Sequence, residues 1–161
     1  MNLNDPKAIL IVDDHQIVRE GVRSVLEALR PSWTVSEAAN GAQAAEIVNG
    51  KSPDLAVIDV TMPDESGLEL TSRLRASGFD RPVLIFTMHQ SQRLDSDVKE
   101  AGAQGYVLKS QATEDLIRAI DILLAGGTFF GGNPAPDIPL ADPSLGNLNY
   151  FSGLARDFPS G

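Results

Sequence analysis

The sequence predicts an α/β protein in which a parallel sheet of five strands carries helices on both faces. Two observations lead to this prediction. Five short apolar runs alternate with amphipathic segments over residues 8–124, and the runs at 55–58 and 83–86 are apolar throughout. Parallel strands are joined by helices that cover both faces of their sheet, so their central strands are buried on both sides and read as continuous apolar runs.

The strands are predicted from short runs rich in apolar and β-branched residues. They are AILIV at 8–12, WTVSEA at 33–38, LAVID at 55–59, PVLIFT at 82–87 and GYVLK at 105–109. Right-handed crossovers leave few ways to arrange five such units. The commonest is the flavodoxin-like strand order 2-1-3-4-5, which we expect here.

Helices are predicted where apolar residues recur at a spacing of three or four between the strands. They cover residues 15–30, 41–49 and 67–77, a fourth segment through Leu94, Val98 and Ala101, and a fifth through Leu116, Ile120 and Leu123. Glycine follows the last two, with Gly102 after the fourth segment and the pair at 126–127 after the fifth. Glycine at this position is a common helix end because it adopts the left-handed conformation without strain.

The composition of the 161-residue chain restricts the kind of protein further. A formal net charge of −9 opposes non-specific binding to nucleic acids and to anionic membranes. No apolar run approaches the roughly 20 residues that a membrane-spanning helix needs, and the polar start MNLNDPK lacks a signal-peptide pattern. The absence of cysteine excludes disulfides and thiolate metal sites. These features favour a cytoplasmic location.

The chain is predicted to form one domain over residues 6–130, followed by a proline- and glycine-rich tail or linker over 131–161. The tail holds five of the ten prolines and shows neither helical nor strand periodicity. Its one basic side chain, Arg156, stands against three aspartates, so we expect no DNA binding by this chain. Its apolar residues are expected to pack on the domain or on a partner chain, unless the segment is only a linker. These residues are Leu145, Leu148, Tyr150, Phe151, Leu154 and Phe158.

Chemistry-bearing side chains stand at the carboxyl ends of four predicted strands. Asp13 and Asp14 follow the first strand, Asp59 ends the third, Thr87 ends the fourth and Lys109 ends the fifth. In an open parallel sheet these ends share one edge, where ligands bind. We therefore expect three carboxylates to converge there, facing a hydroxyl group and an ammonium group.

Three neighbouring carboxylates repel one another, at a cost on the order of 1–4 kcal/mol for each pair near a protein surface. Either one of them takes up a proton or a cation lies among them. Hard oxygen ligands without cysteine or paired histidine suit Mg²⁺, which keeps several waters and is commonly shared with a phosphate oxygen. The predicted edge is therefore suited to a phosphoryl group.

Four segments together resemble the receiver domain of bacterial two-component response regulators. They are IVDDH, VIDVTMPDESGLEL, IFTMH and YVLKS, and the resemblance covers roughly residues 6–129. The TMH and KSQ endings resemble the LuxR/NarL-type subgroup, whose members usually carry a DNA-binding domain. The resemblance implies a signalling switch that is not an enzyme, although it assists its own phosphorylation and its slow dephosphorylation.

The resemblance also implies roles for individual residues in phosphoryl transfer. Asp59 is the expected phosphoacceptor, and the donor is expected to be a sensor histidine kinase or a phosphotransfer protein. The expected Mg²⁺ ligands are Asp59, Asp14 directly, Asp13 through water, and the backbone carbonyl of Thr61.

Three further residues are expected to sense or hold the phosphoryl group. Lys109 is expected to pair with the phosphoryl oxygens and the acceptor carboxylate, and Thr87 to hydrogen-bond a phosphoryl oxygen. Tyr106 matches the switch aromatic, which turns inward when Thr87 moves. The expected output is a changed surface around the fourth helix, fifth strand and fifth helix, and a homodimer is possible.

Three other interpretations of these residues are kept. An aspartate-nucleophile phosphatase of the haloacid dehalogenase type requires Asp-x-Asp after its first strand, whereas here the two aspartates are adjacent, Asp13 and Asp14. A flavodoxin requires a phosphate-binding loop of Ser, Thr and Gly at the same place, where this acidic pair would repel phosphate. A receiver that serves only as a docking module would not need the intact set of site residues.

Overall fold

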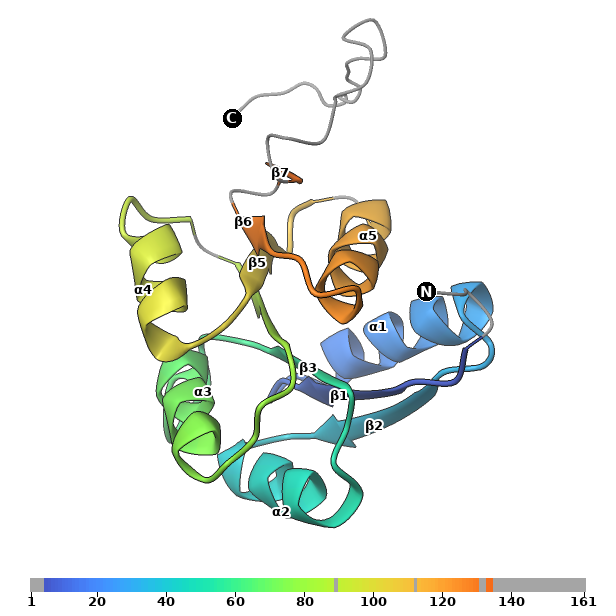
Figure 1. Ribbon diagram of the computed structural model, residues 1–161, viewed down its shortest axis with the longest axis horizontal. Helices are drawn as coiled ribbons and strands as arrows, with labels where there is room; N and C mark the ends of the chain where they lie inside the picture. Colours follow the sequence, from blue (N-terminus) through green and yellow to red (C-terminus); the bar gives the residue numbers. More distant parts are fainter. Residues whose placement is uncertain (1–4, 89, 112, 131–132, 135–161) are drawn as a thin grey trace, which may run out of the picture.

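The computed structural model describes residues 5–88, 90–111, 113–130 and 133–134. One sheet with the strand order β2-β1-β3-β4-β5-β6-β7 runs through the described part of the chain (Figure 1). The first five strands are parallel to their neighbours. The predicted fold class and the order 2-1-3-4-5 are confirmed, and β6 and β7 extend this sheet beyond the five predicted strands.

The predicted elements agree with the structure to within a few residues. The main strands are β1 (Ala8–Val12), β2 (Thr34–Ala38), β3 (Leu55–Ile58), β4 (Val83–Thr87) and β5 (Gly105–Leu108). The helices are α1 (Gln16–Leu29), α2 (Gly41–Lys51), α3 (Gly67–Ala76), α4 (Leu94–Ala101) and α5 (Thr113–Leu124). Gly102 ends α4 with a φ of +97°, which explains why a glycine lies there.

The sheet separates two hydrophobic cores. On one face α1 and α5 contribute Val22, Leu26 and Ile120, and on the other α2, α3 and α4 contribute Val48, Leu70 and Val98, among others (Figure 1). Side chains of β1 alternate between the two cores, with Ile9 and Ile11 facing the first and Leu10 and Val12 the second. This alternation follows from the two-residue period of a strand, and it buries each central strand on both sides.

Two short strands follow α5. β6 (Phe129–Phe130) runs parallel to β5, with Phe129 opposite Gly105, and β7 (Asn133–Pro134) pairs antiparallel to β6. A Cβ atom at Gly105 would lie 2.3 Å from the Phe129 carbonyl oxygen, so glycine is what allows this close approach. Neither strand was predicted from the sequence.

The structure describes little of the predicted tail. Apart from β7, the predicted tail over 131–161 lies outside the described residues, including the apolar side chains expected to pack there.

Within the described residues, no helix combines the length and the apolar character needed to cross a lipid bilayer.

Candidate functional site

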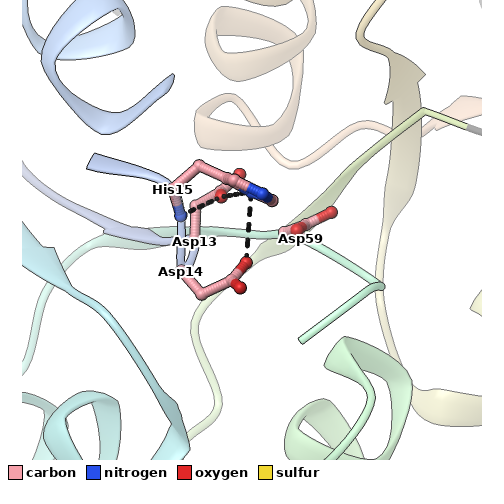
Figure 2. Close-up of side chains that lie close together, drawn as sticks. All are labelled: Asp13, Asp14, His15 and Asp59. Carbon is pink, nitrogen blue, oxygen red and sulfur yellow. Dashed lines mark hydrogen bonds and ion pairs between the residues drawn. The ribbon is translucent and has the colours of Figure 1, made fainter. Parts of the chain in front are cut away.

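An acidic cluster lies at the carboxyl edge of the sheet, where the loops after β1 and β3 meet. Asp13, Asp14, His15 and Asp59 each place one potential ligand atom within 4.8 Å of the others (Figure 2). These residues lie close together because β1 and β3 are neighbouring strands. The pairing continues to their ends, where the Asp59 amide donates to the Val12 carbonyl at 2.9 Å. The predicted convergence of three carboxylates is therefore present.

Asp13 is almost fully buried and is held from several directions. One carboxylate oxygen, Oδ1, accepts a hydrogen bond from the backbone amide of His15 at 2.9 Å. The other, Oδ2, accepts from Nζ of Lys109 at 2.7 Å. Its backbone amide donates to the Ala38 carbonyl of β2 at 3.1 Å. Asp13 thus joins three strands of the sheet at the site edge.

Asp59 lies in a buried and electrostatically unfavourable position. Its Oδ1 is 3.4 Å from Nζ of Lys109 and accepts a long hydrogen bond of 3.4 Å from the Thr61 amide. Burial raises the pKa of Asp59 above its ordinary value, and the nearby charge of Asp13 raises it further. Lys109 and the Thr61 amide offset this increase only in part. A nearby cation would therefore strongly stabilise the charged form of the Asp59 carboxylate.

Asp14 offers the oxygen best placed for a cation. Its Oδ1 is buried and accepts no hydrogen bond, although Nδ1 of His15 lies 3.2 Å away. A buried carboxylate oxygen without a hydrogen bond is costly unless another partner satisfies it. The cluster offers three carboxylates and no thiolate, and this set of hard oxygen donors fits Mg²⁺. Thr61, whose backbone carbonyl is the remaining expected ligand, is an exposed residue two positions after Asp59 in the sequence.

Lys109 and Thr87 approach the cluster from β5 and β4. Thr87, at the end of β4, is 2% exposed, and its carbonyl accepts from the Lys109 amide at 2.7 Å. The Lys109 side chain is itself only 9% exposed. Its ammonium group lies closer to Asp13 than to Asp59, whereas the resemblance led us to expect pairing with the phosphoryl oxygens and the carboxylate of Asp59.

Tyr106 lies inside the structure, in the core formed by α2, α3 and α4. It is 1% exposed, and its ring meets that of Phe130 edge to face at a centroid distance of 6.2 Å. Lys99 of α4 places its ammonium group 4.8 Å from the centre of the Phe130 ring. Tyr106 is therefore already buried in this structure, with β6 packed directly against it, and the inward turn expected when Thr87 moves stays a prediction.

A glycine allows α3 to start close to Asp59. A Cβ atom at Gly67 would lie 2.0 Å from the Asp59 carbonyl oxygen. Ser66, just before this glycine, and Glu69, two residues after it, form a reciprocal capping box at the start of α3. The motif after the acceptor strand thus brings the helix against the backbone of Asp59 and fixes the loop between them.

Comparison with known proteins agrees with this geometry. Residues 9–121 match the model of the response regulator receiver domain. The chain therefore belongs to the response regulator receiver domain family. It is 32% identical to the response regulator UvrY of Escherichia coli K12 over 133 residues, which are 83% of this chain and 61% of UvrY. The chain thus spans only part of the length of this curated relative.

Solved receiver structures resemble the fold as well. A two-component response regulator of the LuxR family from Aurantimonas sp. SI85-9A1 is 40% identical, with a TM-score of 0.73 over 78% of this chain and 89% of that one. The isolated receiver domain of RcsB from Salmonella enterica, solved with the phosphomimetic BeF₃⁻, is 25% identical, with a TM-score of 0.71 over 78% and 94%. These relatives agree with the LuxR/NarL-type resemblance in the sequence.

The structure brings Asp13, Asp14, Asp59, Thr87 and Lys109 together at this edge and places Tyr106 in the core. His15 lies at the edge, as its place after the acidic pair predicts, and Arg19 is a residue that was not predicted. His15, 65% exposed, lies over the acidic pair with Nδ1 3.2 Å from both Asp13 and Asp14 (Figure 2). Arg19 of α1 donates from Nη1 to the backbone carbonyl of Asp13 at 2.6 Å. Arg19 was not predicted because in the sequence it looks like any polar residue of an amphipathic helix. The chain's other histidine, His89, is also expected at the edge of the site because it follows the fourth strand, but it lies outside the described residues.

Proposed function

We propose that this receiver domain is a phosphorylation-activated switch that accepts a phosphoryl group on Asp59 from a phosphohistidine donor. The donor is a sensor histidine kinase or a phosphotransfer protein. A carboxylate oxygen of Asp59 attacks phosphorus, the bond between phosphorus and the donor nitrogen breaks, and the donor imidazole recovers its electron pair. Water later attacks the phosphorus of the aspartyl phosphate slowly, which releases inorganic phosphate and restores the free carboxylate.

The main obstacle to this transfer is electrostatic, since an anionic group approaches two buried carboxylates. Lys109 neutralises part of the charge, at 2.7 Å from Asp13 and 3.4 Å from Asp59. After transfer we expect Lys109 to bind the phosphoryl oxygens. Phosphoryl transfer depends largely on such positioning and charge compensation, because the protein contributes little covalent chemistry apart from the acceptor.

Mg²⁺ is the proposed cofactor. Asp14 and Asp59 would hold it through their carboxylates, Thr61 through its backbone carbonyl, and Asp13 through a water molecule. When bound, the ion supplies positive charge to the phosphoryl oxygens. The buried Asp14 oxygen that accepts no hydrogen bond is the observation that supports this assignment best.

The proposed switch comprises Thr87 and Tyr106. Thr87 is buried at the end of β4, beside the strand that carries Lys109, so a small shift brings its hydroxyl to a phosphoryl oxygen. Tyr106 is already inward here, so movement of Thr87 toward the phosphoryl group is proposed to hold it in that position. The surface formed by α4, β5 and α5 changes in consequence, and this surface is the output of the switch.

We also propose a cytoplasmic protein that forms no membrane contact and does not bind nucleic acid through this chain. A homodimer formed through the output surface is compatible with the proposal. Residues 131–161 are proposed to act as a tail or linker beyond the domain at 6–130. Salt-sensitive, sequence-selective binding of duplex DNA in a mobility assay would contradict the proposal on nucleic acid.

The observation that carries the proposed function is the meeting of Asp13, Asp14, Asp59 and Lys109 in one partly buried cluster. Intact-mass measurement after incubation with acetyl phosphate tests it. With Mg²⁺ the protein should gain one phosphoryl group, which hydroxylamine should remove because it cleaves acyl phosphates. With EDTA in place of Mg²⁺ there should be no gain. An equal gain under both conditions would contradict the proposed metal dependence.

A further inference from the structure

An arginine outside the acidic cluster contacts its backbone. Arg19, in the first turn of α1, donates from Nη1 to the Asp13 carbonyl at 2.6 Å. Its Nε donates to Oε1 of Glu37 on β2 at 2.9 Å. The other oxygen of Glu37 accepts from Nε of Arg23 at 2.6 Å. One guanidinium therefore links the loop after β1 to a side chain on the neighbouring strand.

The geometry of this link makes the position of Arg19 well defined. The side chains of Arg19 and Glu37 are only 14% and 24% exposed. Burial alone raises the pKa of Glu37, but the hydrogen bonds from Arg23 and Arg19 outweigh it, so the pKa lies below its ordinary value and the group stays charged. A guanidinium is planar and rigid, so fixing Nε on a carboxylate also fixes the direction of Nη1.

Asp13 is consequently attached to β2 twice. Its amide donates directly to the Ala38 carbonyl at 3.1 Å, and its carbonyl is held through Arg19 and Glu37. These contacts involve both backbone polar groups of Asp13 and leave its carboxylate for Lys109 and the site. They fix the start of the loop that also carries Asp14.

We propose that Arg19, oriented by Glu37, is a positioning residue that holds the Asp13–Asp14 loop in the geometry needed for Mg²⁺ and phosphoryl transfer. This inference rests on the proposed function, which takes the two aspartates as part of the metal site. Arg19 acts through the Asp13 backbone. Glu37, which it shares with Arg23, offsets part of its charge, and the effect is assigned to geometry and not to the field of the guanidinium.

The same helix supplies a matched control. Near its other end, Arg30 pairs with Asp121 of α5 through two nitrogens, and these side chains are 15% and 25% exposed, almost the same as in the first pair. Arg30 donates to no residue of the acidic cluster in the described structure. Substituting Arg30 therefore removes a comparable buried ion pair without touching the loop.

The test measures Mg²⁺ affinity by titration followed by NMR, the rate of phosphorylation by acetyl phosphate, and thermal unfolding. Arg19→Gln should weaken Mg²⁺ binding about tenfold, the low end of the range for residues that orient metal ligands. Arg30→Gln should lower thermal stability to a similar extent and leave Mg²⁺ affinity within error of the wild type. Equal Mg²⁺ affinities in Arg19→Gln and the wild type would overturn the proposal.

Two further variants separate geometry from charge. Arg19→Lys keeps the charge, but a single ammonium cannot reproduce the fork to Glu37 and Asp13, so binding should stay weak. Full restoration by lysine would assign the effect to charge and refute positioning. Arg19→Gln combined with Glu37→Gln should bind Mg²⁺ no more weakly than Arg19→Gln alone, because Glu37 acts through Arg19.

The failure of this inference can be distinguished from failure of the proposed function. A wild-type protein that neither binds Mg²⁺ nor gains a phosphoryl group would refute the proposed function itself. A wild-type protein that does both, together with an Arg19→Gln variant of equal affinity and rate, would refute only the role of Arg19.

Discussion

The middles and the carboxyl ends of the central strands have opposite properties, although both are buried. Leu10, Leu84 and Ile85 are apolar and 0% exposed in the middle of their strands. At the carboxyl ends of β1 and β3, Asp13 and Asp59 are charged and only 1% and 3% exposed. The apolar middles stabilise the fold through burial, whereas the ends hold like charges together. The site therefore gives up some stability at the edge where it binds ligands.

The largest effect is expected from removing the least satisfied carboxylate at the strand ends. Asp14→Ala should abolish both Mg²⁺ binding and phosphorylation by acetyl phosphate, because the remaining carboxylates cannot hold the ion alone. Intact-mass measurement and Mg²⁺ titration check this. The exposed loop residue Asp64 provides the control, since Asp64→Ala should behave like the wild type. Equal Mg²⁺ affinity in Asp14→Ala and the wild type would refute the proposed metal site.

A substitution in the strand middles should have the reverse pattern. Leu84→Ala should lower the free energy of unfolding by about 2–5 kcal/mol, the usual cost of a cavity in a core. The folded fraction at low temperature should still become phosphorylated, because Leu84 faces the core beneath α1 and α5 and not the acidic cluster. Denaturant unfolding measures the loss, and Leu29→Ala at a 51% exposed position is the control. Loss of phosphorylation in folded Leu84→Ala would contradict the separation between strand middles that stabilise the fold and strand ends that form the site.

Thr87 tests whether the strand ends contain separate receiving and sensing groups. Thr87→Ala should still accept a phosphoryl group but lose most of the spectral change on α4 and β5. The reason is that its hydroxyl binds a phosphoryl oxygen after transfer and takes no part in the attack. NMR shifts with and without beryllofluoride measure the response, and Thr87→Ser should retain it. Identical shifts in Thr87→Ala and wild type would refute the coupling.

The smallest expected effect concerns the stability of the metal-free protein as pH changes. Burial and Asp13 raise the pKa of Asp59 in the folded state above its ordinary value of 3.8. The folded protein therefore binds more protons than the unfolded chain between these two pKa values, and stability falls as pH rises through that window. Asp59→Asn lacks this loss and should be more stable than the wild type at neutral pH.

Thermal unfolding of both proteins in EDTA over a range of pH checks this expectation. The two melting temperatures should approach each other below the window, where Asp59 is protonated and resembles asparagine. A difference in melting temperature that stays constant across the window would show that ionisation of Asp59 is not its cause.

The apolar middles were also the easiest part of the fold to predict. Runs such as 55–58 fill a strand buried on both faces, and glycine marked the end of α4, so these elements were predicted nearly to the residue. β6 was missed because its two residues, Phe129 and Phe130, are too few to show a period. Its position depends on the close approach to Gly105, which local sequence does not reveal.

Prediction of the candidate site followed from strand topology, which brings distant strand ends to one edge. Topology did not reveal which groups pair there. Lys109 binds Asp13 across 96 positions of sequence at a shorter distance than Asp59, an outcome decided by side-chain geometry. Arg19 was not predicted because its side chain binds a backbone carbonyl. Every residue has such a carbonyl, so the pattern of residue types does not indicate this contact.

The central claim is that Asp59 receives the phosphoryl group, and one measurement addresses it directly. Wild type, Asp59→Asn and the control Asp64→Asn are incubated with acetyl phosphate and Mg²⁺, and their intact masses are recorded. Wild type and Asp64→Asn should each gain the mass of one phosphoryl group, and Asp59→Asn should gain none. A full gain of one phosphoryl group by Asp59→Asn would contradict the assignment of Asp59 as the acceptor.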